Sequence, residues 1–230
     1  MNTKKHCLLI GNSRWHWAVQ KNEHWHFTHT APDINKINNL KTSLWKWAAV
    51  GPIPKSLFLN PSQEVQIADI PLLKPPKWLG VDRALASWAA FTKAKSKNLH
   101  SKGLLVADAG TILSLTKITS KGEFAGGQLV AGLTLQRSAI AYGAEKLNPV
   151  TKEHLPNKKF PTSTEEAILR GSFQALLGTL LEAQKDSQMP LWLCGGNSKE
   201  LFEALKMRNL EVYHFPNLVL EGMVNVKNLN

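Results

Sequence analysis

Two short turns in the chain carry residue types that suit phosphate binding. Leu9–Asn12 and Asp108–Thr111 each follow an apolar run and precede a second strand-like run. A glycine in the third place lets backbone amides approach a phosphate closely, and the following Asn or Thr adds a hydrogen-bonding side chain. One such turn is a weak signal, because ordinary β-hairpins contain the same residues. The repetition in matching context predicts a duplicated strand–turn–strand unit that could hold the phosphates of a nucleotide.

A carboxylate and an arginine stand side by side at the start of a predicted helix. Gly80–Arg83 reads Gly-Val-Asp-Arg and opens a helix expected from about Val81 to Lys97. The guanidinium and the helix N-terminus can keep the carboxylate ionised and oriented. Asp82 could also be an ordinary helix N-terminal carboxylate, and Asp108 an ordinary turn-forming aspartate.

Two glycine pairs stand close to predicted strand and helix ends. The segment Gly126–Gly132, which begins with the first pair, leads into a helix, and Gly195-Gly196 follows the buried run Leu191–Cys194. Glycine permits close backbone approach to a ligand, and nucleotides rest at such strand–helix junctions in many α/β sheets. Both pairs are therefore candidates for contact with a nucleotide.

The elements that would position these groups alternate between strands and helices. The proline-rich segment Pro71–Pro76 predicts an irregular connection, since proline neither donates to a ladder nor continues a helix. The expected elements before it are strands at His6–Ile10, Arg14–Gln20 and Glu23–Thr30, a helix at Ile34–Trp45, and strands at Ala48–Val50 and Ser56–Leu59.

The second half of the chain restarts the same pattern. A capping box at Ser163–Glu166 marks the start of its longest helix, although Thr164 could be no more than a first-turn residue. The expected elements are strands at Gly103–Ala107, Ile112–Ile118, Leu191–Cys194 and Val212–Phe215, and helices at Leu133–Tyr142, Thr164–Lys185 and Ser198–Lys206.

The composition is that of an ordinary globular protein. Of 230 residues, 43% are apolar and 20% are charged. No apolar run is long enough to cross a bilayer, and Cys7–Ile10 is too short for a signal-peptide core. Cys7 and Cys194 lie in apolar runs, which is typical of buried, reduced thiols. The expected location is therefore the cytoplasm.

The formal net charge of +11 favours an anionic partner. The lysines are scattered, apart from a denser patch within Lys93–Lys102, and neither a basic tail nor an RNA-binding or zinc-finger signature occurs. Nucleic-acid binding is therefore not expected. The phosphate groups of a nucleotide would be attracted by the same positive field.

Three histidines of the first half and the tryptophans of the chain have structural interpretations. His16, His24 and His26 alternate along predicted strands and lack a second pair at metal-ligand spacing, which indicates sheet-surface positions. The tryptophans, eight in all, are better explained by core and interface packing than by base stacking.

Six motifs in matching order make the chain resemble the type III pantothenate kinases, members of the acetate and sugar kinase, Hsc70 and actin superfamily. The resemblance runs from about Leu8 to Gly196. The family pattern has Asp-x-Gly-Asn-Thr-x-x-Lys, Gly-x-Asp-Arg, Asp-x-Gly-Thr, Gly-Gly-x-Ile-x-Pro-Gly, Asn-Thr-x-x-Ala-Ile and a late Gly-Gly. The corresponding segments here are residues 9–16, 80–83, 108–111, 126–132, 163–168 and 195–196.

The resemblance implies an α/β fold of two ribonuclease H-like (actin-like ATPase) lobes, each a mixed β-sheet flanked by helices. The N-terminal lobe is expected to cover residues 1–102 and to hold the first phosphate turn and the Gly-x-Asp-Arg motif. The C-terminal lobe, residues 103–230, would hold the second phosphate turn and the Gly-Gly motifs.

The family transfers the γ-phosphoryl group of ATP to the primary hydroxyl of pantothenate, giving 4′-phosphopantothenate in the first step of coenzyme A biosynthesis. The resemblance implies that Asp82 is the general base, which aligns the hydroxyl more than it deprotonates it. Gly80, Val81 and Arg83 would hold pantothenate. Thr164 would contact it from the neighbouring subunit of a homodimer.

The same resemblance assigns the cofactor groups. Asp108 would bind the monovalent cation, K⁺ or NH₄⁺, that the family uses beside ATP. Mg²⁺ on the phosphates is required by the chemistry of spreading negative charge. The residues implied to contact the nucleotide are Gly11, Asn12, Ser13, Gly110 and Thr111.

The sequence departs from the family pattern mainly in the first turn. Leu9 stands where the family has Asp, and His16 stands where it has Lys. One negative and one positive group are lost together, so the local charge is nearly unchanged. Ala131 replaces a proline, which only relaxes φ, and no equivalent of the aromatic that precedes Gly-x-Asp-Arg stands within residues 72–75.

Two alternatives to an active pantothenate kinase stay open. One is a non-catalytic accessory or regulatory relative that binds nucleotide, which the changes at Leu9 and His16 motivate. The other is a kinase of a different small hydroxylated acid.

Overall fold

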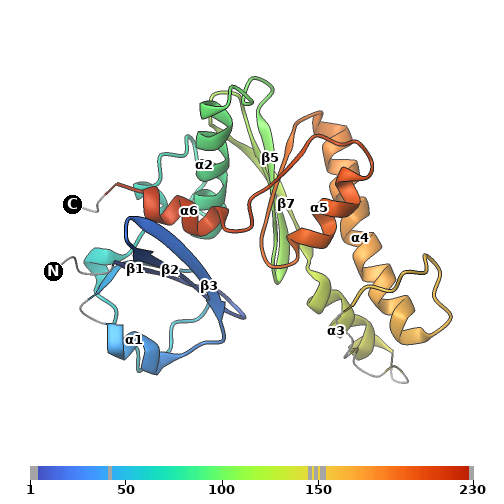
Figure 1. Cartoon of the computed structure of the whole chain (residues 1–230), viewed down its shortest axis with the longest axis horizontal. Coiled ribbons are helices and arrows are strands. Elements are labelled where there is room, and N and C mark those ends of the chain that lie inside the picture. The colour runs from blue at the N-terminus through green and yellow to red at the C-terminus, as the bar shows by residue number, and fades with distance from the viewer. Residues whose placement is uncertain (1–4, 41–42, 145–146, 148–149, 151–153, 228–230) are drawn as a thin grey trace. The chain divides into compact units, whose positions relative to one another are not determined.

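The computed structural model describes residues 5–40, 43–144, 147, 150 and 154–227. These residues form two compact units (Figure 1). Unit 1 comprises Met1–Gly103, Ile118–Ala125 and Asn217–Asn230, and unit 2 comprises Leu104–Lys117 and Gly126–Pro216. The division into an N-terminal lobe of residues 1–102 and a C-terminal lobe of residues 103–230 stays a prediction.

Unit 1 is built on a four-stranded sheet in the order β3-β2-β1-β4. β1 pairs with β2 in antiparallel and with β4 in parallel orientation, and β2 pairs with β3 in antiparallel orientation. The elements of this unit are β1 His6–Ile10, β2 Trp15–Lys21, β3 His24–Thr30, α1 Ile34–Leu40, β4 Leu44–Ala49, α2 Val81–Ser96 and α6 Leu218–Asn225, with 3₁₀ turns at Pro61–Gln63 and Ile67–Asp69.

The second sheet repeats this strand order with one more strand, β7-β6-β5-β8-β9. β5 pairs with β8, and β8 with β9, in parallel orientation. Its strands and the accompanying helices are β5 Leu104–Ala109, β6 Ile112–Ile118, β7 Phe124–Ala131, α3 Leu133–Gly143, α4 Thr164–Ser187, β8 Leu191–Cys194, α5 Ser198–Lys206 and β9 Val212–His214. The predicted strand–turn–strand duplication is therefore present in both sheets.

The hydrophobic core explains where the tryptophans lie. In unit 1 the side chains of Trp15, Trp17 and Trp47 are buried with Leu8 and Ile10. In unit 2 a second cluster joins strands β5, β6 and β8 to one face of α4 and α5. Trp192 on β8 is fully buried. The expectation that tryptophans serve core packing is confirmed at these positions.

The predicted helix Ile34–Trp45 was wrong at its C-terminal end. α1 stops at Leu40, and the chain from Leu44 onward is the strand β4. The apolar spacing continues at helical period, but Leu44 packs in the core beside Trp47 once β4 has paired with β1. Long-range pairing therefore overrides the local pattern.

The predicted strand Ser56–Leu59 was also wrong, because this segment joins no ladder. Only Leu57 is buried, whereas Phe58 is 86% exposed. Strand β7 and helix α6 were not predicted. The glycines of β7 obscure the alternation of apolar and polar residues that indicates a strand.

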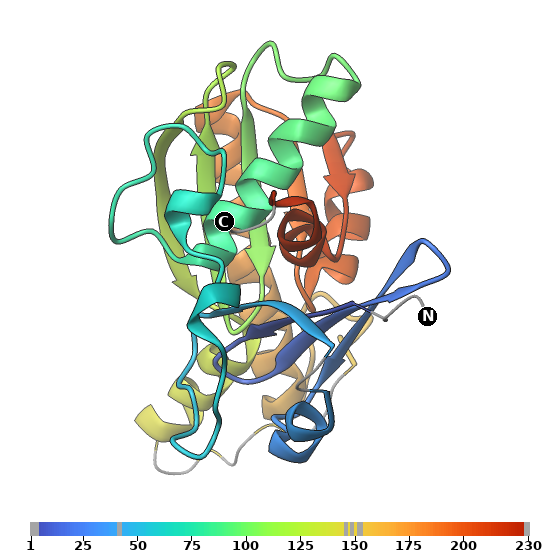
Figure 2. The ribbon, with the colours of Figure 1, turned by 90° about the vertical axis from the view of Figure 1, so that its left-hand side faces the viewer.

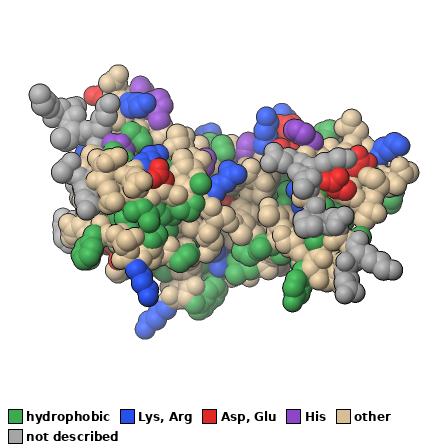
Figure 3. All heavy atoms as spheres, turned by 90° about the horizontal axis from the view of Figure 1, so that it is seen from below, with side chains coloured by type: hydrophobic (Ala, Val, Ile, Leu, Met, Phe, Trp, Pro, Cys, Tyr) green, Lys and Arg blue, Asp and Glu red, His purple; other side chains and the backbone are tan. Residues whose placement is uncertain are grey.

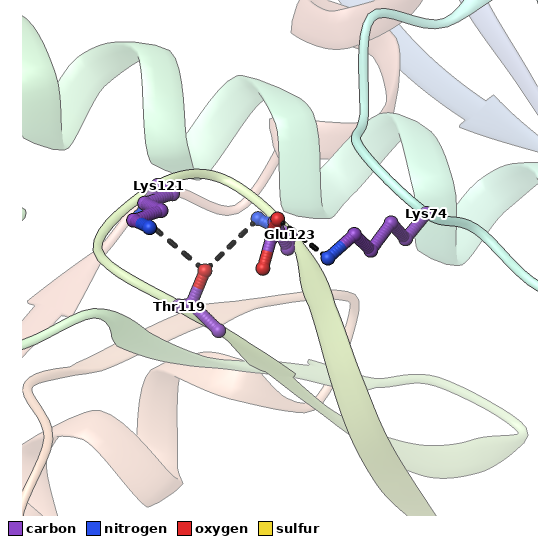
Figure 4. A network of polar contacts seen from close by, with 4 residues as sticks. All are labelled: Lys74, Thr119, Lys121 and Glu123. Carbon is purple, nitrogen blue, oxygen red and sulfur yellow. Dashed lines mark hydrogen bonds and ion pairs between the residues drawn. The ribbon is translucent and has the colours of Figure 1, made fainter.

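The turn between β6 and β7 is fixed by polar contacts (Figure 4). The Oγ1 of Thr119 accepts hydrogen bonds from the backbone N–H groups of Lys121 and Glu123, at 3.3 and 3.2 Å. The carboxylate of Glu123 lies 2.9 Å from Lys74 Nζ. The backbones of Leu73 and Glu123 also form a β-bridge. This turn therefore anchors the segment that leads into α2.

The basic side chains are dispersed on the face that Figure 3 shows. On this face, Lys and Arg side chains stand apart from one another and form no continuous stripe.

None of the helices within the described residues is both long and apolar enough to cross a membrane. Cys7 and Cys194 are both buried and are not joined in a disulfide, as the sequence predicted.

Helix α6 lies directly against α2 within unit 1 (Figures 1 and 2). At the crossing, a Cβ built on Gly222 would lie 2.5 Å from the carbonyl O of Leu85, which is closer than real contacts allow. Glycine therefore sets the distance between these two helices.

We expect Gly222→Ala to destabilise the protein by about 1–3 kcal/mol, because the steric cost of overpacking exceeds the gain in helix propensity. Gly178 on α4 is the matched control, since it is exposed and a Cβ there meets nothing within 4 Å. Gly178→Ala should stabilise the protein by up to about 1 kcal/mol. Thermal unfolding followed by circular dichroism checks both. Equal shifts in the two variants would contradict the steric explanation.

Candidate active site

The first phosphate turn connects β1 to β2. The N–H of Gly11 donates to the carbonyl O of Arg14 at 3.0 Å and closes the turn. Asn12 and Ser13 are exposed on it. Gly51, two residues after the end of β4, packs onto the turn so closely that a Cβ there would lie 2.2 Å from the carbonyl O of Gly11. The structure therefore brings the three predicted nucleotide-binding residues together beside the end of β4.

The predicted catalytic motif forms the start of α2. Gly80 is the N-cap residue, followed by Val81, Asp82 and Arg83 in the first turn. The Oδ1 of Asp82 accepts a hydrogen bond from the backbone N–H of Arg83 at 2.8 Å. A Cβ on Gly80 would lie 2.5 Å from this Oδ1, so only glycine leaves room for the carboxylate in this position.

Burial controls the ionisation of this motif. Desolvation raises the pKa of Asp82 above its usual value, while the backbone hydrogen bond from Arg83 and the charge of its guanidinium act in the opposite direction. Burial also lowers the pKa of Arg83, and the carboxylate of Asp82 opposes that change. Such a raised carboxylate pKa suits a group that receives a proton during a reaction.

A cavity of about 360 Å³ adjoins this motif within unit 1. Val50 at its edge lies 3.9 Å, through Cγ1, from a Cβ position on Gly80. Val50 precedes Gly51, and Gly51 contacts the first turn. The residues that follow β4 therefore lie beside both the first turn and the Gly80–Arg83 motif. The lining residues are Ala49, Val50, Glu64, Val65, Gln66, Ile67, Leu79, Gly80 and Val81.

The second phosphate turn belongs to unit 2 and follows β5. The N–H of Gly110 donates to the carbonyl O of Ile112 at 3.1 Å. Gly195, with φ of 91°, lies directly beside Asp108: a Cβ on it would be 2.3 Å from the Oδ1 of that carboxylate. The predicted Gly195-Gly196 motif thus meets the predicted cation-binding aspartate, and Thr111 follows Gly110 in the same turn.

The segment Gly126–Gly132 leads into helix α3, as the sequence predicted. Gly126 and Gly127 lie within strand β7. Gly132, the N-cap of α3, contacts the second turn, because its Cβ position is 2.3 Å from the carbonyl O of Gly110.

Thr164 is the first residue of α4 and is exposed. The Oγ of the preceding Ser163 accepts from the N–H of Glu166 at 3.4 Å, which confirms the predicted N-cap. The contact of Thr164 with a substrate on a neighbouring subunit stays a prediction.

Sequence reasoning missed two contributions to the site. Gly51 follows a buried strand just as Gly195 does, and this shared strand–glycine pattern could have revealed it. Gln66 and the other cavity residues of the 64–67 loop carry no periodic signal that points to a site.

The second phosphate turn offers one carboxylate, that of Asp108, to the cations that phosphoryl transfer needs. Mg²⁺ is typically held by one or two carboxylates together with substrate phosphates and water. No group of three or more His, Cys, Asp or Glu side chains that could hold a metal is found among the described residues. A cation held by the carboxylate of Asp108 would take its remaining oxygen ligands from the nucleotide and water.

The sequence and the fold both have known relatives. Residues 53–185 match the model of the family described as Type III pantothenate kinase. A Type III pantothenate kinase from Synechococcus sp. (strain JA-2-3B'a(2-13)) is 35% identical over 244 residues, covering 97% of this chain and 89% of the relative. One from Thermosynechococcus vestitus is 32% identical over 209 residues, covering 87% of this chain and 80% of the relative.

Two solved structures show the fold at low sequence identity. A Baf family transcriptional activator from Campylobacter jejuni has a TM-score of 0.63 at 17% identity, covering 96% of each chain. The activator of 2-hydroxyisocaproyl-CoA dehydratase from Clostridium difficile, with bound ADPNP, has a TM-score of 0.56 at 9% identity, covering 98% of this chain and 94% of that one. These likenesses confirm the predicted actin-like ATPase fold.

The family match covers more than half of the chain, and two relatives exceed 30% identity over most of their length. The retained Gly-x-Asp-Arg and Asp-x-Gly-Thr motifs lie in the positions described above. This chain therefore belongs to the type III pantothenate kinase family.

Proposed function

We propose that this chain transfers the γ-phosphoryl group of ATP to pantothenate and forms 4′-phosphopantothenate in coenzyme A biosynthesis. The observation that carries the proposal is Asp82, partly buried at the start of α2 beside a cavity lined by Gly80 and Val81. The names of the relatives point to the same reaction. ATP is a cytoplasmic cosubstrate, so we assign the reaction to the cytoplasm.

Asp82 acts as the base in this proposal. Its carboxylate accepts the proton of the pantothenate hydroxyl as the phosphorus–oxygen bond forms, and its main work is to align that hydroxyl. Gly80, Val81 and Arg83 hold the acceptor. The nucleotide contacts in this proposal are Gly11, Asn12 and Ser13 of the first turn and Gly110 and Thr111 of the second turn.

Asp108 holds the monovalent cation, K⁺ or NH₄⁺, in this proposal. Support comes from its carboxylate beside Gly195 at the second turn, where oxygen ligands from the nucleotide can complete the coordination. Leu9 supplies no carboxylate at the corresponding place of the first turn, and it is buried. Asp108 is then the only acidic side chain of the two turns.

A homodimer is part of the proposal. Helix α3 has no buried residue although it carries several apolar side chains. Leu135 and Ile140 are each 38% exposed and Tyr142 is 95% exposed. An apolar helix face of this kind is typical of a surface that a second copy covers.

Purified protein with ATP, Mg²⁺, K⁺ and pantothenate should yield 4′-phosphopantothenate, detected by mass spectrometry. Asp82→Asn should lower kcat about 100-fold or more, because the amide cannot accept the proton. Binding of Mg-ATP, measured by calorimetry, should change little. The acidic limb of the wild-type kcat profile should lie above the usual aspartate pKa, since only ionised Asp82 is active and burial raises its pKa.

Asp186→Asn is the control, because this aspartate is exposed on α4. It should retain wild-type activity. Full turnover by Asp82→Asn would remove this residue from the base role, and absence of product from the folded wild type would refute the proposed reaction.

Asp108→Asn should weaken activation by K⁺ by about tenfold or more, because a neutral amide attracts the cation far less than a carboxylate does. The rate is measured against K⁺ concentration at constant ionic strength, with tetramethylammonium as the replacement. An unchanged K⁺ dependence in Asp108→Asn would place the cation site elsewhere.

Ile140→Glu should convert the dimer into monomers, since a charge in a buried apolar interface is costly. The molar mass is measured by size-exclusion chromatography with light scattering. Ile53→Glu is the matched control, because Ile53 is 42% exposed but lies in unit 1, away from α3 in the sequence. A monomeric wild type, or a dimeric Ile140→Glu variant, would argue against this interface.

A further inference from the structure

A histidine ring borders the first phosphate turn. His16 lies in β2, opposite Leu9 of β1 on one side and His29 of β3 on the other. A Cβ on Gly11 would lie 3.1 Å from the Nε2 of His16. This nitrogen therefore lies beside the turn that holds the nucleotide in the proposed function.

Two further side chains fix where the protons of this ring lie. The Nδ1 atoms of His16 and His29 are 2.7 Å apart, and the Nε2 of His29 is 3.0 Å from the Oδ1 of Asn217. A carbonyl oxygen only accepts, so the Nε2 of His29 must donate. A neutral His29 then accepts at Nδ1, and the Nδ1 of His16 carries the proton. The neutral His16 is left with a bare lone pair on Nε2, beside the turn.

A bare lone pair and a phosphate oxygen repel each other, because both are acceptors. Protonation of His16 reverses this relation, since an imidazolium Nε2–H donates a charge-assisted hydrogen bond to phosphate. The hydrogen bond to His29 is kept in both states, because Nδ1 of His16 donates in each. Protonation therefore changes only the nitrogen that borders the turn.

The surroundings of His16 keep it neutral without a ligand. Burial lowers the pKa of His16 to about 4, and the nearby His29 and Arg14 act in the same direction. Strand β1 contributes the apolar Leu9, and the start of α6 contributes the uncharged Asn217. No carboxylate is among the groups that act on this ring. The negative charge of a bound phosphate would act in the opposite direction and favour the imidazolium.

We propose that His16 binds the nucleotide phosphates at the first turn as an imidazolium, so that a proton enters from solvent at Nε2 together with the nucleotide. The inference rests on the proposed function, because that function assigns the turn to ATP. The only bond that forms is Nε2–H of His16, with a proton from solvent, and it breaks again when the nucleotide leaves and the proton returns to solvent. A lysine would carry its charge before and after binding, whereas His16 gains it on binding.

The test is calorimetric titration of Mg-ATP into the full chain without pantothenate, at neutral pH, in two buffers of different ionisation enthalpy. The wild type should take up more protons than His16→Lys, by up to about one per nucleotide. The comparison cancels the protons that ATP itself binds, since these are common to both proteins. His26→Gln, an exposed histidine on β3, should match the wild type.

The ¹⁵N chemical shifts of the imidazole provide a second readout that needs no variant. In the free protein, His16 should be the tautomer protonated at Nδ1. Saturation with Mg-ATP should convert it to the doubly protonated ring. His29→Phe removes the acceptor for Nδ1, so a neutral ring can donate from Nε2, and proton uptake should fall while Mg-ATP still binds.

The outcomes separate the two proposals. Turnover of pantothenate with equal proton uptake by wild type and His16→Lys, or a ring that stays neutral with Mg-ATP bound, would overturn the role of His16 and leave the kinase function standing. Failure of the folded wild type to bind Mg-ATP would overturn both.

Discussion

The close approach of a glycine to the end of each central strand is the constraint on which the site depends. Gly51 meets the turn after β1, and Gly195 meets the carboxylate at the end of β5. In each sheet this glycine follows the strand that runs parallel to the central one. The parallel pairing brings both strand ends to one edge of the sheet, and the missing side chain leaves room for the neighbouring turn. A side chain at either position would displace the turn.

Most of the elements whose structure follows from local sequence signals could be predicted. The alternation in β2 and β3 and the Ser163 cap of α4 are local signals of this kind. The first part of β4 and helix α6 could not be predicted in the same way, although a strand was predicted at Ala48–Val50. β4 follows apolar residues at helical spacing, and it is a strand because β1 pairs with it. α6 is short, and it lies against α2, more than a hundred residues earlier in the chain.

The residues of the candidate site differ in the same way: some stand in local motifs, and others depend on partners that are distant in the sequence. Asp82 and Asp108 could be identified because each stands in a short motif with a glycine at a fixed distance. The sequence shows that His16 stands where the family has Lys, but it does not show the hydrogen-bonding partners of the ring, since His29 and Asn217 come from another strand and from the far end of the chain. Alternation along a strand indicates which face a histidine occupies. It does not indicate which of the ring nitrogens carries the proton.

The path of the chain imposes an order on the synthesis of the two units. Unit 2 is inserted into unit 1, whose last part begins at Asn217. The buried ammonium of Lys46 donates to the carbonyl O of Val226, and α6 packs on α2 and β1. On the ribosome, all the strands of unit 2 are made before the residues that complete the core of unit 1. Until then the N-terminal sheet has an uncovered apolar surface and a lysine without its carbonyl partner. Nascent chains stalled before α6 would therefore carry a folded insert inside an unfinished host, and would be preferred substrates for chaperones and proteases.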